Sequence, residues 1–219
     1  SNVVVIPPTS AGPQNNKTWG GFWDHFRHPR GIAIDNIRSK VYIANKLLTG
    51  GSAGVETNGQ VLVWDLAKRT EHVGYANFRA PVPAGFDQEY RPQVLTNSFV
   101  WPSDAAVDEV RGLLYVTNSA NSKIDVFDIK NRPVFIYSFG SEGNNPGQFQ
   151  FPQGLDLDAA GNLYIVDSEN HRIQKFLYDQ ATTRQIFSAA WGQLGSKLSV
   201  PGDIRFRYPV DIAVDDAYG

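Results

Sequence analysis

Residues 147–174 decide the fold, and they read GQFQFPQGLDLDAAGNLYIVDSENHRIQ. Two short apolar runs, 154–158 and 163–167, each end in Asp, and Gly161 and Asn162 lie between them. Short runs rich in Leu, Ile, Val and Tyr, bounded by Gly, Asn and Asp, are typical of strands joined by tight turns. This stretch therefore predicts at least two consecutive antiparallel strands.

The opening phrase of this stretch recurs along the chain. Each copy has Phe, two further residues, Pro, and then a short apolar run that ends in Asp. The four copies are residues 26–35, 99–108, 149–158 and 206–215. Self-similarity at a period of this size indicates a repeat architecture.

Each full copy continues with three further strand-like runs. The expected second strands are residues 41–45, 114–118 and 163–167, and the third strands are residues 60–65, 123–128 and 172–176. The fourth strands end in an aromatic residue followed by Gly140 or Gly192. Four antiparallel strands repeated in this way predict the blade of an all-β fold, the β-propeller.

The third copy, with its phrase Asn170-His171-Arg172-Ile173, closely resembles the NHL repeat, and the pattern extends over about residues 19–219. The second copy has Asn121-Ser122-Lys123-Ile124 at that place, and the first lacks the phrase. We expect one NHL-type propeller domain over residues 1–219, with about three full blades. The expected blades are residues 29–78, 102–140 and 152–192, and a further blade starts at 209.

The resemblance implies a ring of about six blades when complete, so we expect the domain to be incomplete at its C-terminus. It also implies that residues 3–6 and 17–20 supply outer strands of the last blade. Missing residues or another chain would then close the ring.

The chain of 219 residues has 20 Lys and Arg against 22 Asp and Glu, a formal net charge of −2. This balance argues against a domain built mainly to bind nucleic acid or an anionic membrane. The absence of Cys excludes disulfides and thiolate metal sites. No run approaches the roughly 18 apolar residues of a membrane span. The expected partner is another protein chain, with no membrane insertion, and nucleic acid is disfavoured.

An aspartate closes the first strand of every copy: Asp35, Asp108, Asp158 and Asp215. Such a carboxylate accepts backbone N–H bonds in the following turn, and we favour this interpretation over a metal ring around the channel. Gly112 and Gly161 are expected to supply the positive φ of the hairpins.

The histidines offer two candidate sites. His171 has a catalytic interpretation, but its place in the repeat signature implies a loop-stabilising role. His25 and His28 form a His-x-x-His pair that would need further ligands, so metal binding is the weaker alternative there. Nucleophile and phosphate-loop motifs are absent. We therefore assign no catalytic residue, no metal and no cofactor.

Three long connections, residues 46–59, 79–97 and 193–205, depart from a minimal blade. They join either a fourth strand to the next first strand or a second strand to a third, so they share one face, the top face. Long loops on a rigid scaffold are where binding usually occurs. The candidate binding residues are Phe86, Tyr90, Arg91, Arg27, Arg30, Lys46, Arg205 and Arg207.

Three functions remain open. The leading hypothesis is a non-catalytic scaffold for protein–protein interaction that forms one subunit of a larger assembly. The first alternative is a propeller enzyme, resembling a metal-dependent lactonase or an amidating lyase, with its site in the central channel. The second is an RNA-binding NHL domain. The lack of Cys and the sequon at 16–18 favour an extracellular or periplasmic location.

The register of the best blade gives a burial prediction. We expect Leu155, Leu157, Ile165 and Ile173 to be buried between adjacent sheets, and Glu169 and Gln180 to be exposed.

Overall fold

The structure is a computed structural model that describes residues 28–46, 59–65, 72–76, 99–195 and 204–215. Within these ranges nearly all regular structure is β, and the exceptions are two 3-10 turns, η2 (Ser119–Asn121) and η3 (Ser168–Asn170). The predicted all-β class is confirmed.

Twelve of the described strands form three four-stranded antiparallel sheets, each in sequence order. The first sheet contains β1 (His28–Asp35), β2 (Lys40–Lys46), β3 (Gly59–Asp65) and β4 (His72–Ala76). The second contains β5 (Pro102–Asp108), β6 (Leu113–Asn118), β7 (Lys123–Asp128) and β8 (Val134–Phe139). The third contains β9 (Pro152–Leu157), β10 (Leu163–Asp167), β11 (Arg172–Asp179) and β12 (Arg184–Trp191).

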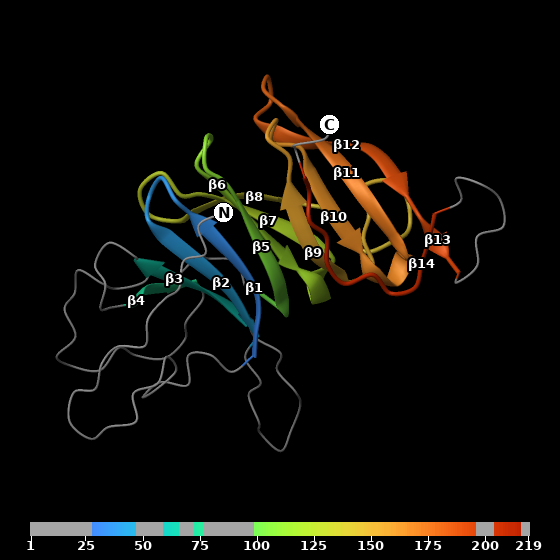
Figure 1. Cartoon of the computed structure of the whole chain (residues 1–219), viewed down its shortest axis with the longest axis horizontal. Helices are drawn as coiled ribbons and strands as arrows, with labels where there is room; N and C mark the ends of the chain where they lie inside the picture. The colour runs from blue at the N-terminus through green and yellow to red at the C-terminus, as the bar shows by residue number, and fades with distance from the viewer. Residues whose placement is uncertain (1–27, 47–58, 66–71, 77–98, 196–203, 216–219) are drawn as a thin grey trace, which may run out of the picture.

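The three sheets fan out around a common line, with β1, β5 and β9 along it (Figure 1). We call the sheets blades one to three and these three strands the inner strands. After β12, the two-residue strands β13 (Gln193–Leu194) and β14 (Arg205–Phe206) pair in parallel. Residues 209–215 then run beside β9 as an extended segment, and Gly154 N–H donates to the Val210 carbonyl at 2.9 Å. This segment is the fourth copy of the repeat phrase.

The hairpins after the inner strands have the predicted chemistry. Asp35, Asp108 and Asp158 each accept a hydrogen bond from a backbone N–H three or four residues later, at 2.8–2.9 Å. Gly112 and Gly161 have φ of +66° and +85°. The Asx-type turn and both glycine predictions are thus confirmed; the turn after Asp215 lies outside the described residues.

The aromatic-Gly motif has a steric cause. Gly140 has a φ of +91°, and a Cβ there would lie 2.5 Å from ring atoms of Phe149, the first Phe of the next repeat phrase. Phe149 is fully buried. The glycine at the end of blade two, like Gly192 beside Phe206 at the end of blade three, therefore allows the phenylalanine of the next phrase to pack directly against the backbone.

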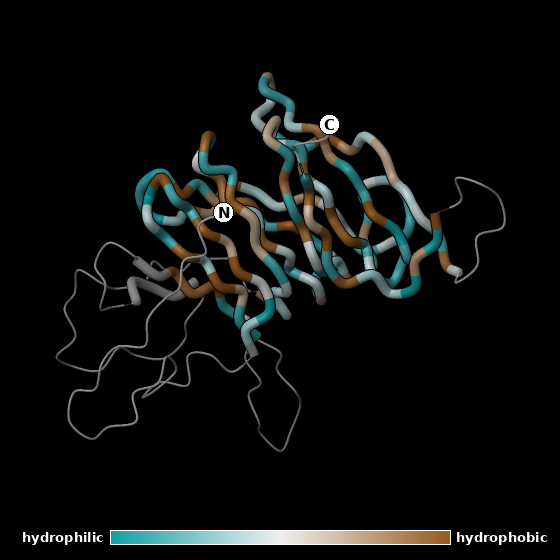
Figure 2. The backbone as a smooth tube through the Cα atoms, in the orientation of Figure 1, coloured by the Kyte–Doolittle hydropathy of each residue, from teal (hydrophilic) through white to brown (hydrophobic). Residues whose placement is uncertain are grey.

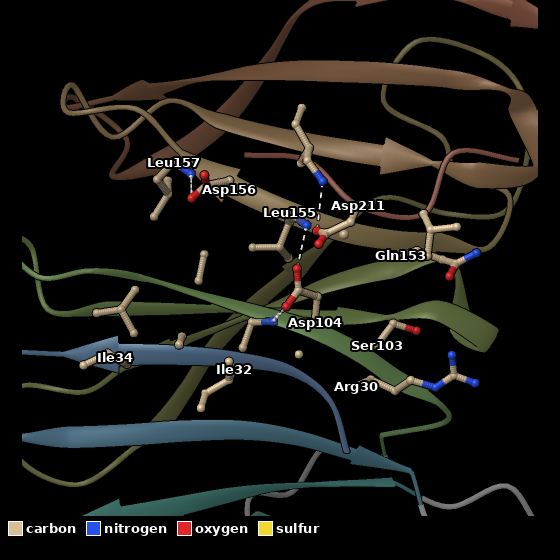
Figure 3. A pocket seen from close by; sticks show the side chains of 18 residues that line it. Arg30, Ile32, Ile34, Ser103, Asp104, Gln153, Leu155, Asp156, Leu157 and Asp211 are labelled. Carbon is tan, nitrogen blue, oxygen red and sulfur yellow. Dashed lines mark hydrogen bonds between the residues drawn. The ribbon is translucent and has the colours of Figure 1, made fainter. Parts of the chain in front are cut away.

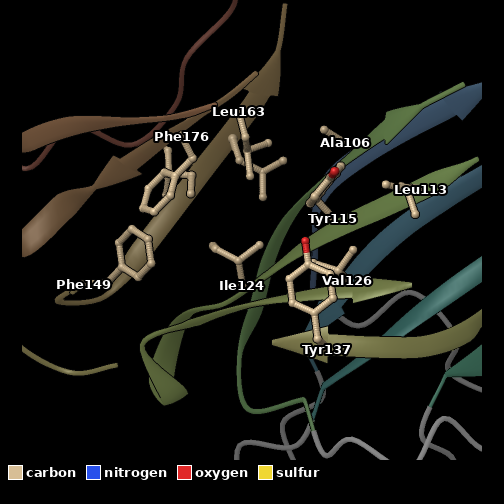
Figure 4. Close-up of a cluster of buried hydrophobic side chains, with 11 residues drawn as sticks. Ala106, Leu113, Tyr115, Ile124, Val126, Tyr137, Phe149, Leu163 and Phe176 are labelled. Atoms are coloured by element: carbon tan, nitrogen blue, oxygen red, sulfur yellow. The ribbon is translucent and has the colours of Figure 1, made fainter. Parts of the chain in front are cut away.

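Hydrophobic stretches recur along the strands of all three blades (Figure 2), and their buried apolar side chains form two cores. One core lies between blades one and two and includes Tyr42, Phe99 and Phe127. The other lies between blades two and three, where Ile124 and Phe176 face each other (Figure 4). The blades therefore associate face to face.

The burial predictions for blade three hold. Leu155, Ile165 and Ile173 are buried, and Leu157 is partly buried against the same core. Glu169 and Gln180 are exposed. The register inferred from the sequence is therefore the register of the fold.

Candidate functional site

The inner strands border a cavity of about 580 Å³. Residues of β1, β5 and β9 line it, together with the segment 210–212. Arg30, Ser103 and Gln153 lie at the end where the inner strands begin, and Asp104 and Asp211 lie further in (Figure 3). The cavity is therefore polar at this end, which we call its entrance, and acidic in the middle.

Asp104 joins two blades. Its Oδ1 accepts a hydrogen bond from Ala105 N–H at 2.8 Å, and its Oδ2 accepts one from Leu155 N–H, on the next blade, at 3.0 Å. The pKa of Asp104 is raised to about 6, chiefly by burial; the two N–H donors act in the opposite direction, and the nearby carboxylates of Asp211 and Asp156 make a smaller upward contribution to the same value.

Asp156 repeats this arrangement one blade later. Its Oδ1 accepts from Leu157 N–H at 2.8 Å, and its Oδ2 accepts from Val214 N–H at 2.7 Å. The Asp211 Oδ1 likewise accepts from Ile212 N–H, at 2.9 Å. These carboxylates are thus engaged with backbone amides, and within the described ranges no group of three His, Asp or Glu has a geometry that would hold a metal ion.

Glycines make room for the aspartates. A Cβ on Gly31 would overlap Asp104, and a Cβ on Gly154 would lie 2.7 Å from the Cα of Asp211. These four residues occupy the same position, two after the proline, in successive copies. Gly and Asp therefore alternate around the cavity, and each glycine lets the inner strand of the next blade approach.

The signature loop of blade three is built around Asp167, which is fully buried. Its Oδ2 accepts hydrogen bonds from Arg172 Nε at 2.7 Å, Asn170 Nδ2 at 2.9 Å and Gln174 Nε2 at 2.9 Å. Its Oδ1 accepts from Gln150 N–H at 2.7 Å. These hydrogen bonds connect the loop between β10 and β11 to the segment that leads into β9 of blade three.

His171 ends η3 in the left-handed conformation, with a φ of 55°. Its Nδ1 accepts a hydrogen bond from Tyr208 N–H at 3.2 Å, and the two rings are 4.6 Å apart, edge to face. The contacts support the loop-stabilising interpretation over the catalytic one.

A set of aromatic residues on the top face was not predicted from the sequence. Trp101, Phe151 and Tyr208 each directly precede the proline of a repeat phrase, and their φ values are +62°, +54° and +49°. An aromatic-Pro pair in three of the four copies was the signal that could have revealed them. The residue before proline is ordinarily extended, so sequence rules alone do not predict this backbone.

Four of the predicted binding residues lie within the described ranges. Arg30 is exposed at the cavity entrance, and Arg207 is exposed beside Tyr208. Arg205 is half-buried on β14, where it donates to the Leu194 carbonyl at 3.3 Å. Lys46 is only 7% exposed, and its Nζ lies 2.7 Å from the centroid of the Trp101 ring.

The burial of Lys46 gives it a role in joining blades one and two and leaves little of it accessible to a partner. The other candidates, Phe86, Tyr90, Arg91, Arg27 and His25, lie outside the described residues, as does the side chain of His28. In the part of the chain that is described, no helix has the length and apolar character needed to cross a membrane.

Comparison with known proteins agrees with this geometry. The family model of the NHL repeat matches residues 149–176. A curated relative, Protein SUPPRESSOR OF QUENCHING 1, chloroplastic, of Arabidopsis thaliana, is 32% identical over 102 residues, which cover 43% of this chain and 10% of that protein. The chain therefore spans about a tenth of the length of this relative.

Two solved structures share the fold. Hydrazine synthase of Kuenenia stuttgartiensis matches with a TM-score of 0.50 and 15% identity, over 90% of this chain and 41% of the other. A Bacteroides thetaiotaomicron protein of unknown function matches with a TM-score of 0.52 and 15% identity, over 84% of this chain and 41% of the other. At this identity the likeness establishes the arrangement of strands and no activity.

Proposed function

Because the chain belongs to the NHL-repeat β-propellers, we propose that it is a non-catalytic scaffold that binds another protein chain through its top face. It would act as one subunit of a larger assembly. The fold alone does not select this function, since propellers carry many unrelated activities. The hydrogen bonds made by the charged groups of the cavity favour the scaffold.

The observation that carries the proposal is the engagement of the cavity carboxylates. Both oxygens of Asp104 and both of Asp156 accept backbone N–H bonds, and each residue bridges to the next copy of the repeat phrase. A general base or metal ligand needs a lone pair directed at the substrate or ion. Carboxylates held in this way favour a structural role for the cavity, and they leave the top face as the better candidate for function.

The top face offers groups suited to a protein partner. Arg30, Arg207 and Tyr208 are exposed on it, and Tyr and Arg are enriched among the residues that dominate binding energy at interfaces. The insertions at 46–59 and 79–97 leave from this same side of the blades by their place in the connectivity. We propose Phe86, Tyr90 and Arg91 as further anchors.

Site-specific photo-crosslinking tests the proposal. A benzophenone amino acid is placed at Tyr90 in one variant and at Arg132, in the connection between β7 and β8 on the opposite side, in the other. We expect crosslinks to a defined partner from position 90 and none from position 132. With that partner purified, F86A/Y90A should weaken binding by more than about 2 kcal/mol, typical of hot spots. Equal crosslinking from both faces would contradict the top-face assignment.

An enzyme with its site in the cavity is the second candidate. The raised pKa of Asp104, about 6, favours it, because an acid that titrates near neutral pH suits proton transfer. Metal analysis of the purified protein separates the two: one equivalent of metal that is lost in D104N would favour the enzyme. RNA binding would be recognised by an affinity that falls steeply with salt.

A further inference from the structure

The aromatic residues before the repeat prolines form what we call the aromatic arc: Trp101, Phe151 and Tyr208. All three are in the left-handed region, which bulky residues avoid and which a following proline further disfavours. Backbone strain of this kind clusters at functional sites. The strained backbone recurs at three equivalent positions, which indicates one function shared by the three residues.

Contacts hold the arc in this conformation. The Trp101 carbonyl accepts from Ser119 N–H at 3.2 Å, and the rings of Trp101 and Phe151 meet edge to face at 5.3 Å. Tyr208 N–H donates to His171 Nδ1. Trp101 and Phe151 are partly exposed, and Tyr208 is 56% exposed. The arc therefore presents rigid aromatic surface where the inner strands begin.

Cations lie at both ends of the arc. Lys46 lies over the Trp101 ring, and Arg30 is close enough to lower the pKa of Lys46, after the larger effect of burial. Arg207 is exposed next to Tyr208. Among the described residues, Glu169 is one exposed acidic residue beside the arc, since its N–H donates to the Gln150 carbonyl at 3.1 Å. The positive charges outnumber it.

We propose that the aromatic arc binds an acidic segment of a partner polypeptide, with an aromatic or proline side chain against the rings and carboxylates on Arg30 and Arg207. This inference rests on the proposed scaffold function and names the partner chemistry. Asp104 and Asp211 inside the cavity would repel a carboxylate. The segment is therefore expected to lie across the entrance and not to enter it.

A polypeptide fits this surface better than single-stranded nucleic acid. Base stacking needs open ring faces, whereas Lys46 covers a face of Trp101 and the Phe151 ring contacts Trp101 edge to face. The chain also carries a net charge of −2. The side chains of a bound peptide, in contrast, need only the uncovered surface and the edges of these rings.

Fluorescence anisotropy with synthetic probes tests the inference. The probes are a labelled, blocked hexapeptide Glu-Glu-Trp-Pro-Glu-Glu, its counterpart with Lys for every Glu, and a hexamer of uridine RNA. We expect the acidic peptide to bind the full chain at least tenfold more tightly than the basic one. Y208A and R207E should each weaken it at least fivefold, while R132E, of equal charge change on the opposite face, leaves it unchanged.

Several results would overturn the inference: preference for the basic peptide, tighter binding of the RNA, no binding of any probe, or affinities unchanged in Y208A and R207E. Thermal unfolding of each variant shows whether a loss reflects misfolding, and R207K, which keeps the charge, should restore binding. With the crosslinked partner in hand, F86A/Y90A separates the two proposals. If it weakens binding while Y208A and R207E do not, the scaffold function stands and the arc assignment fails.

Discussion

The Oδ2 of Asp104 on β5 accepts a hydrogen bond from the backbone N–H of Leu155 on β9, at 3.0 Å. One blade later, Val214 N–H donates to Asp156 Oδ2 in the same way, at 2.7 Å. In each pair, the donor belongs to the next copy of the repeat phrase. Its position in the phrase is one residue later than the position of the acceptor. Within a β-sheet such an N–H would donate to a backbone carbonyl of the neighbouring strand. Here a side-chain carboxylate accepts it instead.

The titration of Asp104 predicts how stability depends on pH. Burial raises its pKa in the folded chain to about 6, above its ordinary value of 3.8, so the folded state binds this proton more tightly. The unfavourable contribution of the buried carboxylate is fully present above pH 6 and is relieved as the pH falls toward 4. The free energy of unfolding should therefore rise by about 2 kcal/mol from this group between pH 7 and pH 4.5.

Denaturant unfolding of the wild type and of D104N at several pH values measures this contribution. As the pH falls, the free energy of unfolding of the wild type should increase relative to that of D104N. Asp158 and Asp179 have lowered pKa values, so their contributions are lost only below their ordinary range. A difference that stays constant from pH 7 to pH 4.5 would show that Asp104 titrates normally.

The alternation of Gly and Asp around the cavity gives a steric prediction. G31A would bring a Cβ within 2.5 Å of the Asp104 Cα, and G154A would bring one within 2.7 Å of the Asp211 Cα. Because the clashes are with backbone atoms, the strands must separate, and we expect each change to cost more than about 2 kcal/mol.

G147A is the matched control. Gly147 has a φ of +79°, but an added Cβ would meet nothing closer than Phe187 Cβ at 4.0 Å. It should cost only the backbone strain, about 1 kcal/mol. Chemical denaturation checks the order, and a G31A protein as stable as G147A would mean that the inner strands are not in close contact.

The sequence predicted the features whose cause is local. Asp108 closes a turn with its own neighbours, and Gly161 needs positive φ within a single hairpin, so the repeat phrase encodes both. It did not predict the bond from Leu155 to Asp104, because that bond depends on which strands become neighbours across blades. The left-handed backbone at Phe151 opposes the ordinary preference of a residue before proline, and tertiary contacts maintain it.

Asp167 should be the most sensitive polar residue of blade three. D167A would leave the Arg172 guanidinium and the Gln174 amide without their shared acceptor in a buried loop. Removing one partner of such a buried pair costs about 3–5 kcal/mol. Thermal and denaturant unfolding measure it, with D128A as control, since Asp128 meets Lys130 in a largely exposed pair at 3.5 Å. Equal losses for the two variants would contradict the role of Asp167.

The left-handed backbone of the aromatic arc can be tested by comparing two replacements at one site. At an extended position Ala is more stable than Gly, because Gly loses more conformational entropy on folding. At Phe151, where φ is +54°, Ala keeps the strain of the left-handed region and Gly does not. Both variants lose the same contact with the Trp101 ring. We therefore expect F151G to be more stable than F151A by about 1 kcal/mol.

The same pair of replacements at Val107, in the extended strand β5, provides the control, and there V107A should be the more stable. Denaturant unfolding of the four proteins gives both comparisons under identical conditions. If F151A is at least as stable as F151G, the backbone before Pro152 is free to relax. The aromatic arc would then be a set of ordinary surface side chains without a fixed geometry, and the case for a built binding surface at the entrance of the cavity would fail with it.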